Sequence, residues 1–143
     1  VDVATLAQEL ADYEQAHSIC DAGRIAALLS STQTPQCELL IATYKNKTIA
    51  FALYYVGYDL SSDTYGFHLA DICVSHAYRR HGVGRSLMQN MAQQALETDR
   101  HWISLTVLDH NADARGFYRS LGLSHVPVSF MAAGRTTLSS MCE

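Results

Sequence analysis

Two arginines, a histidine and two spaced glycines lie together in the stretch SHAYRRHGVGRSLM, residues 75–88. Glycine lets the backbone approach a ligand closely because it carries no Cβ atom. The residues that follow have a helical pattern, and the start of a helix offers unpaired N–H groups and the positive end of its dipole. The stretch therefore predicts a binding site for a phosphate group.

Two common nucleotide motifs do not fit this stretch. A dinucleotide fingerprint that starts at Gly82 requires a third glycine where the chain has Leu87. A Walker loop requires lysine where the chain has Arg85, and its first glycine would fall on Arg79. The motif that the chain does contain is R-x-x-G-x-G, residues 79–84, between a predicted strand and a predicted helix.

The composition is that of an ordinary globular chain with an acidic balance. Its 143 residues are 48% hydrophobic and 17% charged, which fits a single domain over residues 1–143. A net charge of −4 argues against a nucleic-acid partner, which requires a basic face. No apolar run approaches the length of a membrane span and no signal-peptide pattern opens the chain, so we expect no membrane partner.

The cysteines and histidines predict no metal site. The four cysteines show no C-x-x-C spacing, and the seven histidines form no H-x-x-x-H pair with an accompanying carboxylate cluster. We therefore expect reduced thiols and a cytoplasmic location.

Hydrophobic periodicity predicts alternating helices and strands. Helices are expected over residues 4–16, 22–31, 83 to about 97, and 111–122, the last capped by Asn111 and ended by Gly122. Strands are expected in a hairpin over 37–58 that turns at 45–47, over 65–75 with both faces buried, over 101–108, and once or twice in the tail, 123–140.

Two segments, residues 69–96 and 105–123, resemble the GNAT family of N-acetyltransferases. The first has the strand, R-x-x-G-x-G loop and helix of that family, and the second has its asparagine-bearing turn and N…FY…G helix. The resemblance implies an α+β fold with a mostly antiparallel twisted sheet, splayed central strands and helices on both faces. It also implies acetyl-CoA as cofactor. The family's short first strand has no counterpart, which fits a trimmed start.

The resemblance implies roles for the cofactor-binding residues. Backbone groups of Ile72, Cys73 and Val74 match those that pair with the pantetheine arm, and the matching asparagine, Asn111, contacts the same arm. Arg79 adds charge and fixes the loop. Main-chain N–H groups that match the pyrophosphate cradle come from Arg80, His81, Gly82, Val83, Gly84 and Arg85. The family often has glycine where Arg80 stands, and this arginine could also reach the 3′-phosphate of coenzyme A. The alternative is that Arg80 and Arg85 are only solvated surface charges. A protonated His81 could favour phosphate.

Tyr118 matches the tyrosine that lies near the thioester sulfur in the family. It follows Asn111 by seven residues, two turns of one helix, so the two share a face. A phenol with a pKa of about 10 is neutral at working pH and can protonate the departing thiolate. The alternative is that Tyr118 only packs.

The substrate side is similar to the diamine and polyamine branch of the family, but one residue departs. That branch has a Glu-Asp pair on this strand, and the chain has Ala70 and Asp71. Asp71 either binds an ammonium group or braces the fold. His68 is expected to point to the same side as Ala70. It is either a base in place of the glutamate that this chain lacks, or a structural histidine. Tyr54 and Tyr55 either line the substrate cleft or pack in the core.

Two classes of function remain open. The first is an N-acetyltransferase that acetylates a small primary amine by direct attack in a ternary complex. The second is a coenzyme A-binding module of this fold with little catalysis. Acetylation of a protein or peptide is a further alternative. Because C-terminal strands often form dimers in the family, we also expect a homodimer.

Overall fold

The computed structural model describes residues 2–15, 21–30 and 37–142. It divides into two compact units, residues 1–108 and 109–143. No helix within these described ranges combines the length and the apolar character needed to cross a lipid bilayer.

The first unit opens with two helices, α1, Val3–Tyr13, and α2, Ala22–Ser30. An aspartate side chain starts each of them, because its oxygen accepts a bond from an N–H group that has no partner within the helix. Asp2 accepts from the Thr5 N–H at 2.8 Å, and Asp21 accepts from the Arg24 N–H at 2.8 Å.

The sheet has four strands in the order β1-β2-β3-β4. Strands β1, Cys37–Tyr44, β2, Lys47–Asp59, and β3, Thr64–Val74, are antiparallel, and β4, Ile103–Leu105, runs parallel to β3. The predicted first hairpin is confirmed: Lys45 and Asn46 form its turn with φ angles of 48° and 62°, as a two-residue hairpin loop requires. The last strand is much shorter than the predicted 101–108.

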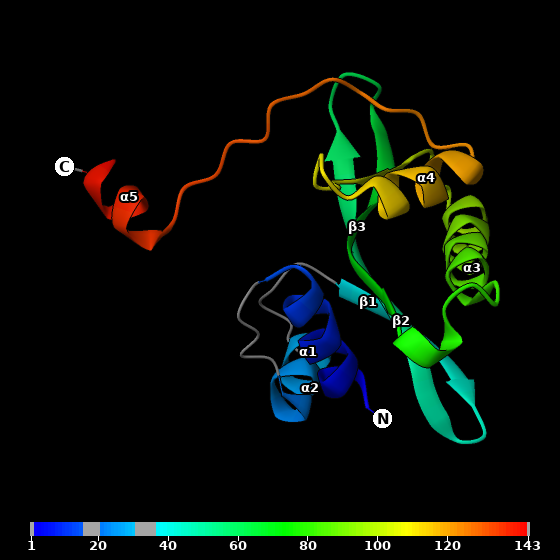
Figure 1. Ribbon diagram of the computed structural model, residues 1–143. Helices are drawn as coiled ribbons and strands as arrows, with labels where there is room; N and C mark the ends of the chain where they lie inside the picture. The colour runs from blue at the N-terminus through cyan, green and yellow to red at the C-terminus, as the bar shows by residue number, and fades with distance from the viewer. Residues whose placement is uncertain (1, 16–20, 31–36, 143) are drawn as a thin grey trace. The chain divides into compact units, whose positions relative to one another are not determined.

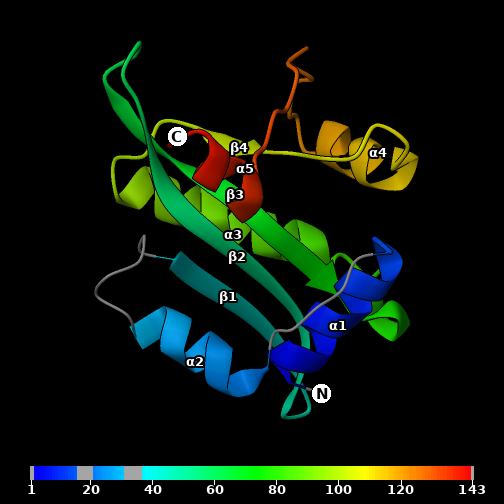
Figure 2. The same cartoon turned by 90° about the vertical axis from the view of Figure 1, so that its left-hand side faces the viewer.

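Helices cover both faces of this sheet (Figures 1 and 2). Helices α1 and α2 lie on one face, and α3, Val83–Glu97, lies on the other. Leu6 of α1 packs against Phe51 and Cys73, and all three are buried. The expected α+β architecture, a mostly antiparallel sheet between helices, is confirmed. The expectation that β3 is buried on both faces is wrong, because only four of its eleven residues, Gly66, Phe67, Leu69 and Cys73, are buried.

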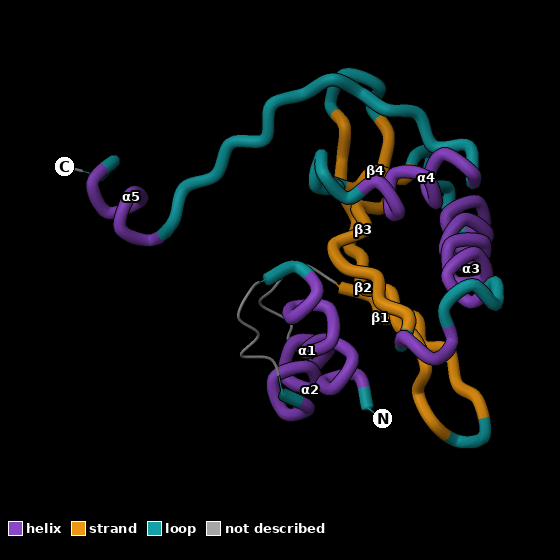
Figure 3. The backbone as a smooth tube through the Cα atoms, in the orientation of Figure 1, coloured by secondary structure: helices purple, strands orange, loops and turns teal. Residues whose placement is uncertain are grey.

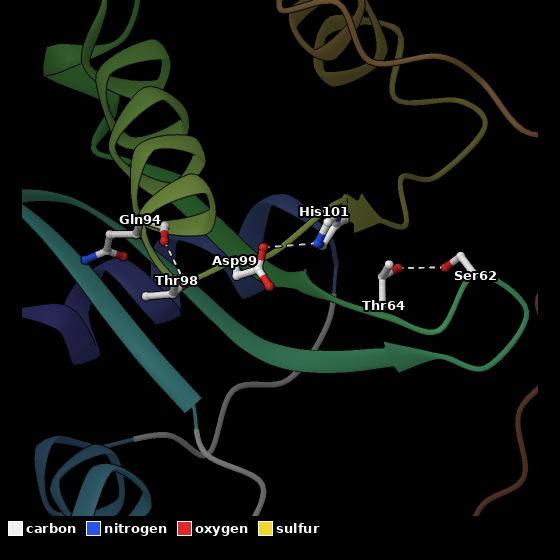
Figure 4. Close-up of polar contacts among 6 residues, drawn as sticks. All are labelled: Ser62, Thr64, Gln94, Thr98, Asp99 and His101. Carbon is white, nitrogen blue, oxygen red and sulfur yellow. Dashed lines mark hydrogen bonds and ion pairs between the residues drawn. The ribbon is translucent and has the colours of Figure 1, made fainter.

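Polar contacts tie the connection from α3 to β4 (Figure 4). The Thr98 hydroxyl donates to the Gln94 carbonyl at 2.7 Å, and Asp99 turns the chain with a φ of 55°. Asp99 Oδ1 lies 3.2 Å from His101 Nε2, and the His101 N–H donates to the Tyr65 carbonyl of β3 at 2.8 Å. The connection therefore places the start of β4 beside the edge of β3.

The second unit contains two short helices, α4, Ala112–Ser120, and α5, Arg135–Ser140. Both predicted ends of α4 are confirmed. The Asn111 side chain accepts from the Ala114 N–H at 3.0 Å, and Gly122, with φ 93°, follows the last turn. The N–H groups of Gly122 and Leu123 return to carbonyls of that turn, so the exposed ends of the helix are satisfied.

The prediction of strands in the tail is wrong. Residues 123–134 have neither helix nor strand, and they lead into α5 (Figure 3). Val126, Val128 and Phe130 alternate as in a strand, yet they are between 66 and 79% exposed. The physical reason is that alternation produces a strand only where a neighbouring strand supplies hydrogen bonds. No described strand pairs with this segment.

Candidate active site

The loop between β3 and α3 presents the start of a long helix. Gly82 precedes α3 with a φ of 81°, a left-handed conformation that glycine adopts without strain. Arg80 also has a positive φ, 63°, which explains why glycine suits that position. The first N–H groups of α3 lack partners within the helix, as in any helix. The geometry therefore offers donors and a positive dipole end to an anion.

Two side chains of the loop hold its backbone. Arg79 Nε donates to the Val74 carbonyl at 2.9 Å, and its guanidinium group lies 5.6 Å from the centre of the Tyr13 ring of α1. His81 Nδ1 lies 2.7 Å from the Arg79 carbonyl, so this nitrogen must be the donor. These contacts fit the predicted loop-fixing role of Arg79, and they connect the loop to the end of β3.

One edge of β3 is open beside this loop. On the β2 side, Ile72, Cys73 and Val74 pair with Ala52, Phe51 and Ala50. On the other side, β4 pairs only with residues 67–69, so no described strand continues the ladder past Leu69. Backbone groups there are available to an extended ligand, and their pairing with the pantetheine arm stays a prediction. Burial raises the pKa of the Cys73 thiol to about 11, so its side chain is an inert part of the core.

A bulge in β3 changes which side chains share a face. Tyr54 pairs with Leu69 whereas Leu53 pairs with Asp71, so Ala70 is an extra residue in β3. In a regular strand residues three apart point to opposite faces. The bulge brings His68 and Asp71 to the same face, the one that carries α1 and α2. The expected alignment of His68 with Ala70 is therefore replaced by an alignment with Asp71.

Asp71 is half-buried, and burial raises the pKa of its carboxyl group. Among the described residues, no hydrogen-bond donor or cation contacts its side chain. A carboxylate held in such a place favours a cationic ligand, which would supply the missing partner.

Three side chains form a row across this face, one from each of three strands. Tyr55 of β2 pairs with His68 of β3, and their ring centres are 5.0 Å apart. Ser104 of β4 pairs with His68 on its other side, and Ser104 Oγ lies 2.9 Å from His68 Nδ1. We call these three residues the Tyr55–His68–Ser104 row. Sequence reasoning missed Ser104, because only the register of β4 reveals it.

Tyr54 points to the opposite face, towards α3. Its side chain is fully buried, its hydroxyl donates to Glu38 Oε2 at 2.9 Å, and it also contacts the side-chain amide of Gln94. Burial and the bond to Glu38 raise the pKa of this phenol well above its usual range. The two neighbouring tyrosines are thus divided: Tyr54 belongs to the core, and Tyr55 lies on the face with His68.

Trp102 fixes the start of β4 against the sheet. Gly57 and Gly66 pair across β2 and β3, and a Cβ atom on Gly66 would lie 2.0 Å from Trp102 Cδ2. The indole therefore occupies the space that two side chains would otherwise fill. The Trp102 carbonyl accepts from the Phe67 N–H at 2.9 Å, which holds the same register through the backbone.

Asn111 and Tyr118 belong to the second unit. The Asn111 side-chain oxygen caps α4, and the Tyr118 ring lies 5.2 Å from the ring of Phe117. Both side chains are partly buried. Their predicted roles at the cofactor rest on the resemblance.

Comparison with known proteins identifies relatives of known type. Residues 4–123 match the Acetyltransferase (GNAT) family. The chain is 32% identical over 72 residues to the L-ornithine N5-acetyltransferase NATA1 of Arabidopsis thaliana, which covers 50% of this chain and 32% of that protein. It is 30% identical over 98 residues to the thialysine N-epsilon-acetyltransferase of Bos taurus, which covers 68% and 52%. The chain thus spans about a third to a half of these relatives.

Solved structures share the fold at lower identity. An integron cassette protein from the mobile metagenome of V. cholerae superimposes with a TM-score of 0.78 at 23% identity and covers 94% of this chain and 86% of that one. An aminoglycoside acetyltransferase from an uncultured soil metagenomic sample gives 0.75 at 20% identity, with 91% and 86% covered. The family match spans both the R-x-x-G-x-G loop and the α4 helix, and we conclude that the chain belongs to the acetyltransferase (GNAT) family.

Proposed function

We propose that this chain catalyses acetyl-CoA-dependent N-acetylation of a small primary amine, in particular an amino acid or diamine with a terminal amino group. The observation that carries the proposal is the bulge at Ala70, which brings His68 and Asp71 to one face of the sheet. The two relatives named for ornithine and thialysine support the choice of substrate class. The loop before α3 supports the choice of cofactor.

The residues around the loop fit acetyl-CoA. Its pyrophosphate is anionic, and the start of α3 combines N–H donors with a left-handed turn at Arg80 and Gly82. The open edge of β3 at residues 72–74 suits the amides of the pantetheine arm. When bound, acetyl-CoA supplies the activated acetyl group.

The side chains of the site then divide the remaining work. The carboxylate of Asp71 binds an ammonium group of the substrate, and the ring of Tyr55 contacts its alkyl chain. A primary amine with a pKa of about 10.4 arrives mostly protonated and cannot attack a carbonyl. His68 accepts that proton as the general base. The role of Tyr118 as proton donor to the leaving sulfur rests on the resemblance to the family alone.

The test is detection of product by mass spectrometry. The chain is incubated with acetyl-CoA and, separately, with ornithine, thialysine, lysine, putrescine, spermidine and a lysine-containing peptide. We expect acetylated product from the amino acids or diamines. The Tyr118→Phe variant should lose about 100-fold in kcat and keep its affinity for coenzyme A, whereas Tyr44→Phe, which removes an exposed tyrosine hydroxyl, should change neither.

Each other outcome favours a different function. Coenzyme A binding without acetylation of any amine would favour a binding module. Acetylation of the peptide alone would favour a protein substrate. A thiol-dye assay is unsuitable, because the chain's own cysteines react with the dye.

We further propose that the protein acts as a homodimer in the cytoplasm. The exposed apolar side chains of the tail, among them Val128, Phe130 and Met131, support a contact with a second copy. Sedimentation of the purified chain at several concentrations tests the dimer, and a single monomeric species at all of them would contradict it.

A further inference from the structure

The contact between His68 and Ser104 links two strands of very different length. Strand β3 has eleven residues and carries His68, whereas β4 has three residues and carries Ser104 at its centre. Ser104 Oγ lies 2.9 Å from His68 Nδ1, and it is the only hydroxyl or charged group that hydrogen-bonds this imidazole among the described residues. The imidazole is thus held at one nitrogen only.

The register that creates this contact is strongly specified. Opposite residues of a parallel pair share a face, and a slip of one residue would turn Ser104 to the other face. Three pairs alone would specify the register weakly. The Trp102 indole, which lies over Gly57 and Gly66, opposes such a slip, because a shift of one residue would turn the indole to the other face and leave that space empty.

The ring of Tyr55 is the second neighbour that restrains the His68 imidazole. Its ring centre lies 5.0 Å from that of His68, with the planes inclined by 42°. A ring held by an aromatic neighbour on one strand and by a hydroxyl on another has little freedom to rotate. These two contacts, from β2 and β4, therefore fix where its remaining nitrogen, Nε2, points.

We propose that Ser104 is a positioning residue that keeps His68 in the tautomer with hydrogen on Nδ1. In this arrangement Nδ1–H donates to Ser104 Oγ, and the lone pair of Nε2 faces the substrate. The inference rests on the proposed function, because it assigns Ser104 to the same reaction. The proton of the substrate ammonium moves to Nε2, the amine keeps the electron pair of the broken N–H bond, and the imidazolium later loses a proton to solvent.

The opposite tautomer would not serve this reaction. If Ser104 donated its hydroxyl proton to Nδ1, hydrogen would have to occupy Nε2, and that nitrogen could not accept the proton of an amine. The position of one hydrogen atom therefore decides whether His68 can act as a base. Among the described residues no other donor contacts the Ser104 hydroxyl, so its oxygen is available to accept from Nδ1–H.

The kinetic test compares three substitutions at one position. Ser104→Val removes the hydroxyl, Ser104→Thr keeps it on a side chain of the same shape as valine, and Ser104→Ala removes it with little change in volume. We expect kcat to fall about tenfold in the valine and alanine variants and to return to within about threefold in the threonine variant. The KM for acetyl-CoA should stay unchanged in all three.

Two further variants serve as matched controls. Ser62→Ala removes a hydroxyl that lies 2.6 Å from the Thr64 hydroxyl and donates to Asp59 Oδ2 at 2.8 Å. His101→Gln removes an exposed imidazole paired with Asp99 (Figure 4). Neither should change kcat. Equal activity of the threonine and valine variants would overturn the proposal.

The spectroscopic test needs no catalysis. Long-range ¹H–¹⁵N correlation spectra distinguish the two tautomers of each imidazole, and the signals of His68 are identified by their loss in His68→Gln. We expect the Nδ1–H tautomer in the unchanged protein and a shift towards Nε2–H in Ser104→Val. Finding Nε2–H in the unchanged protein overturns the proposal, whereas failure to acetylate any amine, with the expected tautomer present, overturns the proposed function instead.

Discussion

At the scale of single residues, the charge of Asp71 is costly for folding. Burial raises the pKa of its carboxyl group, so the ionised form is less stable in the folded chain than in the unfolded chain. Groups of this kind are retained where activity requires them, at the expense of stability. Replacing such a group should therefore increase stability and reduce activity.

We predict that Asp71→Asn raises the free energy of unfolding at pH 7 by less than about 1 kcal/mol, because the group is only half-buried and solvent screens part of its charge. A raised folded pKa means that the contribution of the carboxyl group is fully present below its unfolded pKa and is lost as the pH rises through the folded value. The advantage of the variant should therefore be absent at low pH and grow towards neutral pH. Urea unfolding at several pH values measures it, and we expect a higher KM for the amine.

Asp59 provides a control of opposite sign. Bonds from Ser61 and Ser62 lower the pKa of its carboxyl group, which is fully exposed. Asp59→Asn should lower stability at neutral pH, and the difference should disappear as the pH falls through the folded pKa. Equal pH dependence in the two variants would argue against the burial of Asp71.

At the scale of elements, the register of β4 depends on the two glycines beneath Trp102. We predict that Gly66→Ala lowers the free energy of unfolding by about 2 kcal/mol, because its new methyl group would overlap the indole. Gly116→Ala in α4 is the matched change, since nothing lies within 4 Å of the added atom. Alanine favours a helix, so that variant should gain up to about 1 kcal/mol. Thermal unfolding followed by circular dichroism measures both.

At the loop before α3, the backbone and the Arg80 side chain contribute separately to the predicted affinity for coenzyme A. Arg80 has a left-handed backbone, which glycine and asparagine both tolerate. We predict that Arg80→Gly and Arg80→Asn fold normally and bind coenzyme A about tenfold more weakly, because they lose a contact with its 3′-phosphate. Their affinity for dephospho-coenzyme A should match that of the unchanged chain. Calorimetric titration gives these constants, and an equal loss for both ligands would assign Arg80 to the pyrophosphate instead.

The elements that the sequence predicts are those with local causes. The turn at Lys45 and Asn46, the helix from Val83 and the cap at Asn111 each follow from residues within a few positions of one another. The bulge at Ala70 and the pairing of His68 with Ser104 do not, because they depend on how strands distant in sequence align. The candidate site was therefore predicted as a set of residues, while the face that joins them came from the structure.

At the scale of the whole molecule, the sequence predicted a sheet between helices correctly and the tail incorrectly. Val126 and Val128 alternate with polar residues or proline, which is also the pattern of an exposed segment when no strand pairs with it. A period of two residues specifies which side chains share a face. It does not supply the hydrogen-bonding partner that a strand needs.

We predict that proteases cut first within residues 124–134 when the chain is dilute. This segment has no helix or strand, and its side chains are exposed. Mass spectrometry after brief thermolysin treatment should identify a product that ends near Phe130 and retains β1 to α4. Protection of the segment at high protein concentration would support the proposed dimer, and earlier cleavage in the β2–β3 hairpin would contradict the prediction.

Trp102 is the single tryptophan of the sequence, and it lies on the same face as the Tyr55–His68–Ser104 row. Excitation at the long-wavelength edge of the protein's absorption therefore gives fluorescence from Trp102 alone, two residues before Ser104. An amine that occupies this face should alter the colour and intensity of that emission. The chain thus contains an intrinsic fluorophore with which the binding of an amine to this face can be tested in real time without a label.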